Sequence, residues 1–243
     1  MHKIFLFMMF IFLCTPTIAY SREPYLVKRT YDLKTGTGFY VNGYGYLVTN
    51  AHVVDTCSFI NVKTDDQKKP ASAKLMAINN ELDVAILKTA NNAHPAAPMH
   101  SDKNLKKGEK VMIIGYPGKA GLQRNYIFRS GEVVDPDGFT VADRDRYIQF
   151  SDISAKGNSG GPLLDDSGNV IGIVTAKMSA SSPDWEEDYR VSLAIKMKKV
   201  KDFLDRHYVA YNPVFGFIPR SKQSLEQKAR DFIVSIHCYH SDR

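Results

Sequence analysis

The chain is poor in cysteine and in long apolar runs. Three of its 243 residues are cysteine, which is too few for a small scaffold held together by disulfides. The longest apolar run covers about ten residues near the N-terminus, whereas ~20 are needed to span a bilayer. Internal repeats and low-complexity segments are absent. Apolar residues make up 44% and charged residues 24%, which is ordinary globular composition and excludes a collagen-like or wholly disordered chain.

The charge balance offers little support for a nucleic-acid function. The net charge is +6, from 32 Lys and Arg against 26 Asp and Glu. This excess is modest and spread along the chain, whereas nucleic-acid binding proteins concentrate basic residues in a patch. We therefore expect no nucleic-acid partner.

The N-terminus has the layout of a secretory signal peptide. Lys3 precedes the apolar run of residues 4–13, and small residues lead to Ala19. We predict a signal peptide over residues 1–19 with cleavage after Ala19; an uncleaved anchor is the alternative. The mature chain is then expected to be exported, either periplasmic or secreted, without stable membrane insertion.

The mature chain would keep two cysteines, Cys57 and Cys238. An exported protein meets oxidising conditions, which permit a disulfide. The sequence does not show whether their Cα atoms come within bonding distance, so a disulfide and two separate thiols both stay open.

Most of the mature chain has the pattern of short strands separated by turns. Residues 38–49 predict a hairpin around an Asn-Gly turn, and short apolar strands follow at residues 84–87, 111–114, 147–150 and 170–174. Many short strands with regular turns indicate a sandwich or barrel.

Helical spacing is confined to the C-terminal part. Met197, Val200, Phe203 and Leu204 share one helical face. A second helix is predicted from Ser224 onward, on an apolar face formed by Leu225, Ala229, Phe232, Ile233 and Ile236. An extended connector over residues 208–219 would join the two helices.

The sharpest chemical signal is a serine surrounded by glycines. Residues 157–162 are Gly-Asn-Ser-Gly-Gly-Pro. Glycines allow the unusual backbone that a projecting Ser159 nucleophile needs, with N–H groups directed at an oxyanion. A phosphate-binding loop is the competing interpretation, but it would require Gly-Lys-Ser/Thr opening a helix, and here a turn and a strand follow.

His52 is the candidate base for this serine. A serine hydroxyl needs a base to take its proton, and His52 directly follows the second strand of the predicted hairpin, which would fix its position. The other histidines lack such a setting. His237, Cys238 and His240 cluster near the C-terminus, but this is a weak metal signal, and we predict no metal site.

Asp83 is the candidate third member. It is the one acidic residue that leads directly into a strongly apolar strand. A charge placed there would be costly to bury without a partner, and an imidazole N–H is a suitable one. A carboxylate in this role holds the histidine in the correct tautomer and stabilises its cation. An exposed aspartate at the start of a strand is the alternative.

These motifs occur in the order His, Asp, Ser, and together they resemble the chymotrypsin-like serine proteases. The resemblance is to the bacterial trypsin-like branch that includes the HtrA/Deg proteases. It is carried by residues 49–54, 83–87 and 157–163, and by two flanking motifs at residues 36–39 and 168–173. It covers roughly residues 34–206.

The resemblance implies an all-β fold of two chymotrypsin-like β-barrels with the active site between them. His52 and Asp83 would come from the first barrel and Ser159 from the second. The backbone N–H groups of Gly157 and Ser159 would form the oxyanion hole, and no metal or organic cofactor would be required. The expected domains are a protease domain over residues 20–206 and a C-terminal extension over residues 207–243, formed by a connector and a helix.

The chain departs from the resembled families in two ways. Asn158 stands where digestive trypsin-like enzymes have an aspartate that pairs with a newly cut N-terminus, so activation of that type is not expected. About 37 residues follow Arg206, too few for the PDZ domain usual in HtrA-type enzymes. The oligomeric state is left open.

The resemblance also suggests which residues contact substrate. Ile153 would lie at the base of the specificity pocket, and Thr175, Ala176 and Lys177 would form its wall or the strand that pairs with substrate. Ile153 favours a small or medium aliphatic residue before the cut. Lys177 leaves an acidic residue as the alternative.

The leading functional hypothesis is therefore an exported serine endopeptidase acting on proteins or peptides. A catalytically weak protease-fold protein that binds peptides or acts as a chaperone is the second hypothesis, although a pure binding module would not need all three catalytic residues. An esterase on an α/β-hydrolase fold is the third. Its order would be Ser, Asp, His, with alternating helices, and neither is found here.

Overall fold

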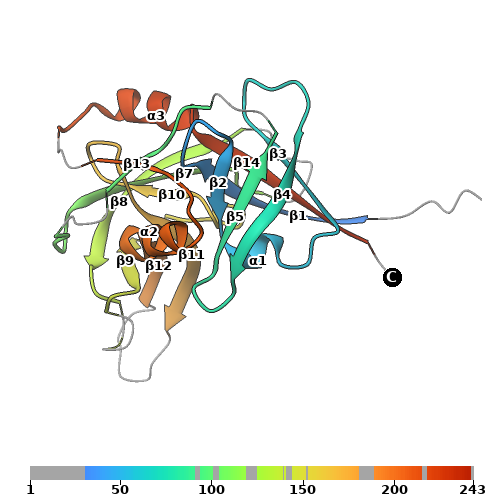
Figure 1. Ribbon diagram of the computed structural model, residues 1–243. Coiled ribbons are helices and arrows are strands. Elements are labelled where there is room, and N and C mark those ends of the chain that lie inside the picture. Colours follow the sequence, from blue (N-terminus) through green and yellow to red (C-terminus); the bar gives the residue numbers. More distant parts are fainter. Residues whose placement is uncertain are drawn as a thin grey trace, which may run out of the picture.

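The protein is described by a computed structural model over residues 31–90, 94–100, 104–118, 125–138, 140, 144–151, 153–180, 189–214 and 218–241. The predicted signal peptide lies outside these residues. Two β-barrels, with short helices around them, make up the described chain (Figure 1).

Six antiparallel strands close the first barrel in the order β1-β14-β3-β4-β5-β2. These strands are β1 (Tyr31–Tyr40), β2 (Tyr46–Thr49), β3 (Phe59–Lys63), β4 (Ala71–Asn79), β5 (Val84–Thr89) and β14 (Ile233–Ser241). Five of them come from residues 31–89 and the sixth from the end of the described chain. Figure 1 shows this last strand, in red, lying beside the blue β1.

The second barrel is built from the middle of the chain. Its ring follows the order β10-β7-β8-β9-β12-β11 and closes where β10 pairs with β11. The ring strands are β7 (Lys110–Gly115), β8 (Ile127–Asp135), β9 (Tyr147–Ser151), β10 (Pro162–Leu164), β11 (Val170–Ala180) and β12 (Tyr189–Lys196). Two short strands, β6 (Pro98–Met99) and β13 (Asn212–Pro213), extend this sheet from β11.

The described helices are short. They are α1 (Ala51–Val54), α2 (Met197–Arg206) and α3 (Lys222–Arg230). The four residues predicted to share a face of α2 are all buried in the core between the barrels. Within the described residues, no helix combines the length and apolar character needed to cross a bilayer. The predicted all-β fold of two barrels with C-terminal helices is confirmed.

The barrels pack against each other through the outer faces of their strands. In β5, Ala85 and Leu87 lie in the core of the first barrel, whereas Val84 and Ile86 lie in the core shared with the second barrel and α2. Strand β7 alternates in the same way between the second barrel and the shared core. Because both faces are buried, these strands are continuous apolar runs. The close packing fixes the candidate site residues carried by one barrel relative to those of the other.

The second predicted helix is correct only in its first part. Helix α3 ends at Arg230, and Ile233 and Ile236 belong to strand β14 instead. From Val234 onward, buried and less buried residues alternate, which is the period of a strand. Strand pairing to β1 on one side and β3 on the other outweighs the helical spacing. The C-terminal extension therefore contributes a strand of the first barrel.

The two cysteines whose pairing the sequence left open form a disulfide with each other. Cys57 lies just beyond α1 and Cys238 lies on β14, with their Cα atoms 5.2 Å apart. The bond joins residues that are 181 positions apart in sequence. It ties the segment that follows His52 to the last strand of the barrel.

Candidate active site

His52 is held at the end of a barrel strand. It lies in the single turn of α1, which follows β2 after one residue, Asn50. Its Nδ1 lies 2.9 Å from Oδ2 and 3.0 Å from Oδ1 of Asp83. Its backbone N–H also donates to Oδ1 of Asp83, at 3.0 Å. Both the ring and the main chain of His52 are thus fixed by one carboxylate.

Asp83 occupies a backbone conformation that few side chains adopt. Its φ is +58°, in the left-handed region, where Asp is one of the better-tolerated residues. The buried side chain of Asn50 supports this conformation, because its Nδ2 donates to the carbonyl of Asp83 at 2.9 Å. The strand β5 begins at the next residue, so Asp83 is anchored on its C-terminal side as well.

The electrostatic surroundings of Asp83 favour its ionised form. Burial by itself would raise the pKa of this carboxyl. Hydrogen bonds from the His52 ring, the Thr175 hydroxyl and the His52 N–H outweigh burial, so the pKa of Asp83 lies below its ordinary value. A carboxylate that stays charged can hold His52 Nδ1–H and stabilise an imidazolium.

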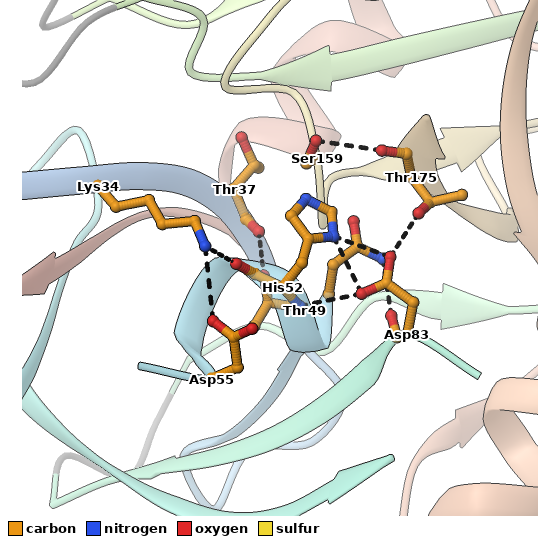
Figure 2. Close-up of polar contacts among 9 residues, drawn as sticks. Lys34, Thr37, Thr49, His52, Asp55, Asp83, Ser159 and Thr175 are labelled. Atoms are coloured by element: carbon orange, nitrogen blue, oxygen red, sulfur yellow. Dashed lines mark hydrogen bonds and ion pairs between the residues drawn. The ribbon is translucent and has the colours of Figure 1, made fainter. Parts of the chain in front are cut away.

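Thr175 has a role that the sequence did not indicate. The resemblance implies that it lines the substrate pocket, but its Oγ1 donates to Oδ2 of Asp83 at 2.5 Å. Its carbonyl accepts from Oγ of Ser159 at 3.2 Å. Thr175, on β11 of the second barrel, thereby contacts a catalytic candidate from each barrel. Figure 2 shows it on one side of the His52 ring, between Asp83 and Ser159.

Ser159 lies on a tight turn that only glycine can complete. Gly160 has φ +85°, and a Cβ there would lie 2.1 Å from the carbonyl oxygen of Thr37. The imidazole of His52 lies between the carboxylate of Asp83 and Ser159 (Figure 2). The Ser159 hydroxyl donates to the Thr175 carbonyl and is not hydrogen-bonded to His52. Rotation of the Ser159 side chain is needed to complete a Ser–His–Asp arrangement.

The carbonyls around Ser159 are fixed by hydrogen bonds. Lys156 O accepts from Gly118 N–H at 2.9 Å, and Gly157 O accepts from Thr37 Oγ1 at 2.8 Å. Asn158 O accepts from the N–H of Gly161, and Ser159 O accepts from the N–H of Thr37, both at 2.9 Å.

Fixing these carbonyls also orients the N–H groups of the same peptide units. Within the described residues, no group accepts from the N–H of Gly157 or Ser159. The turn is therefore the candidate oxyanion hole, because an oxyanion requires two oriented donors beside the nucleophile.

The other residues predicted to contact substrate also belong to the second barrel. Ile153 packs against the core of the second barrel. Its neighbour Ser154 is buried and exchanges a hydrogen bond with Ser192 of β12, at 2.7 Å between the two Oγ atoms. Ala176 and Lys177 lie on β11, paired in register with Leu193 and Ser192.

The histidines near the C-terminus have other partners. His240 Nδ1 lies 2.7 Å from the carbonyl of Thr56, and His237 Nε2 lies 3.3 Å from Ser235 Oγ. Cys238 is in the disulfide. The described residues contain no cluster of three or more His, Cys, Asp or Glu side chains that could hold a metal ion.

A histidine–carboxylate pair on one β-barrel, facing a serine in a glycine turn on a second barrel, defines the class of trypsin-like serine peptidases. Residues 36–173, more than half of the chain, match the trypsin-like peptidase domain. The chain belongs to this family.

The chain is similar to several relatives, two of which are named here as serine proteases and one as an uncharacterized protein. The chain is 36% identical over 147 residues to a "Probable periplasmic serine endoprotease DegP-like" of Chlamydia pneumoniae, covering 60% of this chain and 29% of the relative. It is 34% identical over 191 residues to "Serine protease HTRA1A" of Danio rerio, covering 74% and 36%. It is also 32% identical over 208 residues to the "Uncharacterized protein y4bJ" of Sinorhizobium fredii, covering 84% and 32%. The chain therefore spans about a third of the length of these curated relatives.

Proposed function

We propose that the chain is an exported serine endopeptidase that hydrolyses peptide bonds through His52, Asp83 and Ser159. The observation that carries this proposal is the two-point contact of the Asp83 carboxylate with the ring and main chain of His52, opposite Ser159. A histidine oriented in this way has its second ring nitrogen available as a general base.

The reaction would proceed through an acyl-enzyme. Ser159 Oγ, turned from Thr175 to His52 Nε2, attacks the peptide carbonyl carbon as His52 takes its proton. The peptide C–N bond then breaks, and His52 returns the proton to the leaving amine. A water, deprotonated by His52, then attacks the ester carbonyl. The ester C–O bond breaks, His52 returns the proton to Ser159 Oγ, and the acyl group leaves as a carboxylic acid.

The N–H groups of Gly157 and Ser159 would bind the oxyanion formed in each half of this reaction. Because the neighbouring carbonyls already have donors, the two N–H groups need not reorganise when charge develops. Losing one such donor typically costs ~100-fold or more in rate.

Export is supported by two features. The predicted signal peptide occupies residues 1–19, and the disulfide between Cys57 and Cys238 suits an oxidising compartment. The DegP-like relatives are named as periplasmic proteins, which favours a periplasmic or secreted location for this chain. The proposed substrates are proteins or peptides.

The residue preferred before the cut stays a prediction. We favour a small or medium aliphatic residue over an acidic one. Ser154, next to Ile153, forms a buried hydroxyl pair with Ser192, which pairs in register with Lys177 on the neighbouring strand, and this pair carries no positive charge. An acidic substrate side chain would need a cation, for which Lys177 is the candidate.

The deciding experiment compares the mature protein with Ser159→Ala on an unfolded protein substrate, with the cut sites determined by mass spectrometry. We expect cleavage and fluorophosphonate labelling of the parent, and neither in the variant. Ser167→Ala is the matched control, because the Ser167 hydroxyl lies in the β10–β11 turn without a hydrogen-bond partner in the described chain.

The possible outcomes separate the proposals. Equal cleavage by the parent and Ser159→Ala would overturn the assignment of the nucleophile. An unlabelled and inactive parent that still binds unfolded protein would favour the alternative, a peptide-binding or chaperone-like protein. Cuts after acidic residues would reverse the predicted specificity.

A further inference from the structure

We propose that Tyr116 is a positioning residue for the oxyanion hole, through a hydrogen bond of its side chain to Asp65 of the other barrel. This inference rests on the proposed peptidase function. Tyr116 follows β7 in the second barrel and is 7% exposed. Asp65 lies in the turn after β3 in the first barrel.

The side chain of Tyr116 connects the two barrels. Its hydroxyl donates to Oδ1 of Asp65 at 3.0 Å. Burial and the Asp65 carboxylate both raise the pKa of Tyr116, so the hydroxyl keeps its proton and stays a donor. A charged acceptor makes this hydrogen bond stronger than one between neutral groups.

The backbone at Tyr116 holds the turn that carries the nucleophile. The N–H of Tyr116 donates at 2.9 Å to Oγ1 of Thr37, which donates in turn to the Gly157 carbonyl at 2.8 Å. Two residues on, the N–H of Gly118 donates to the Lys156 carbonyl at 2.9 Å. These are the carbonyls of the two peptide units that flank Gly157.

Direct contact reinforces these hydrogen bonds. A Cβ built on Gly157 would lie 2.5 Å from the carbonyl oxygen of Tyr116 and 3.1 Å from the nitrogen of Gly118. The segment 116–118 is therefore the surface against which Gly157 rests. A small displacement of this segment would turn the Gly157 N–H away from the developing charge, and displacements of ~1 Å can cost 100-fold in rate.

The C-terminal helix supports Asp65 from its other side. Arg230 of α3 has its Nε 3.7 Å from Oδ2 of Asp65, and its guanidinium lies over the ring of Tyr126. The hydroxyl of Tyr126 donates to Glu226, also on α3, at 3.0 Å. Half-exposed ion pairs of this kind contribute little by themselves. The hydrogen bond of Tyr116 is thus the contact expected to matter most.

Tyr126 provides a matched control. Tyr116→Phe and Tyr126→Phe each remove one hydroxyl that donates to a carboxylate beside α3, but only Tyr116 connects to Gly157. We expect Tyr116→Phe to lower kcat roughly tenfold with KM within about twofold, and Tyr126→Phe to leave both near the parent values. A peptide boronic acid, which mimics the tetrahedral intermediate, should lose affinity for Tyr116→Phe by the same factor as kcat/KM.

Asp65→Ala removes the acceptor and tests the same contact independently. It should reproduce the loss in kcat, and the double variant should lose no more than either single variant, because both changes break one hydrogen bond. Should Tyr116→Phe fail to fold, Asp65→Ala alone decides the question.

The result distinguishes this inference from the proposed function. A parent that neither cleaves nor reacts with fluorophosphonate would overturn the peptidase proposal itself. An active parent with unchanged kcat and boronate affinity in Tyr116→Phe and Asp65→Ala would overturn the positioning role. Equal losses in Tyr116→Phe and Tyr126→Phe, with equal drops in Tm, would reduce Tyr116 to a structural contact of α3.

Discussion

At the scale of single residues, Asp83 is a side chain of the candidate site that residues of both barrels contact. It accepts from the ring and main chain of His52 in its own barrel and from the hydroxyl of Thr175 in the other. Each of these hydrogen bonds favours the carboxylate over the carboxylic acid. Ionised Asp83 therefore stabilises the folded protein in addition to orienting His52.

The lowered pKa of Asp83 predicts a specific dependence of stability on pH. A carboxyl whose pKa is lower in the folded state stabilises the fold fully above its unfolded-state pKa of ~3.9. That contribution is lost as the pH falls through the folded-state pKa. The free energy of unfolding should thus fall less steeply between about pH 5 and pH 2 in Asp83→Asn than in the parent.

Urea denaturation at a series of pH values measures this difference. Both proteins should carry Ser159→Ala, so that self-cleavage does not distort the curves. If the free energy of unfolding changes with pH in the same way in both proteins, Asp83 is not stabilised as a carboxylate in the folded state.

Residue patterns in the sequence indicated His52, Asp83 and Ser159, but not their supporting contacts. Each of the three stands in a distinctive local context: a strand end, the start of an apolar strand, and a run of glycines. Thr37 and Asn50 lie within the resembled motifs, and Thr175 was expected to contact substrate, but the sequence did not indicate their contacts with the site. Their importance comes from contacts between segments 33 to 120 residues apart, which local patterns do not contain.

At the scale of elements, the turn from Gly157 to Gly161 is held by segments from both barrels. Thr37 of β1 contacts it through its N–H and its hydroxyl, and Val174 of β11 accepts from the N–H of Gly160. The turn leaves no room for a side chain at Gly160. Its conformation is thus set by packing as much as by its own hydrogen bonds.

Two alanine substitutions separate packing from backbone preference. Gly160 and Gly108 both have positive φ, at +85° and +83°, but a Cβ at Gly108 would have no atom within 4 Å. Gly108→Ala should cost about 1–2 kcal/mol of stability, from the left-handed backbone alone. Gly160→Ala should cost roughly 3 kcal/mol or more, because its Cβ also overlaps Thr37 and Thr49.

Urea unfolding gives the two free energies, and the rate of fluorophosphonate labelling reports on Ser159. In Gly160→Ala, labelling should be lost at urea concentrations well below the unfolding midpoint of that variant. In Gly108→Ala, labelling should be retained below its own midpoint. Equal effects of the two substitutions on stability would mean that the turn relaxes to accept a side chain.

The elements themselves were predicted unevenly. The core strands and α2 could be predicted from the sequence because the spacing of their apolar residues matches the faces that they bury in the fold. The end of the chain was ambiguous: Leu225, Ala229 and Phe232 follow a helical spacing, while Val234, Ile236 and Cys238 alternate as a strand. The outcome depends on β1 and β3, whose edges are available for pairing only in the folded barrel.

At the scale of the whole molecule, the two ends of the described chain form one barrel. Strand β1 pairs with β14 along nine residue pairs, from Tyr31 with Ser241 to Phe39 with Ile233. The catalytic candidates His52 and Asp83 belong to this same barrel, so the site depends on the last strand. The second barrel is complete without it.

The disulfide between Cys57 and Cys238 should therefore determine the stability of the first barrel. The bond closes a loop of 181 residues, and cross-links over such long separations typically contribute about 2–5 kcal/mol. Reduction should lower the free energy of unfolding by that amount. Because Cys57 lies three residues beyond α1, reduction should also lower the temperature at which peptidase activity is lost.

Urea unfolding and activity after heating, each with and without a phosphine reductant, provide the measurement. The double variant Cys57→Ser, Cys238→Ser is the control: it should resemble the reduced parent and be indifferent to reductant. If neither the urea midpoint nor the temperature of inactivation of the parent changes on complete reduction, strand pairing alone holds β14 in the barrel. A loss of activity on reduction with no loss of stability would instead place the effect at α1, which carries the candidate base His52 and lies next to Cys57.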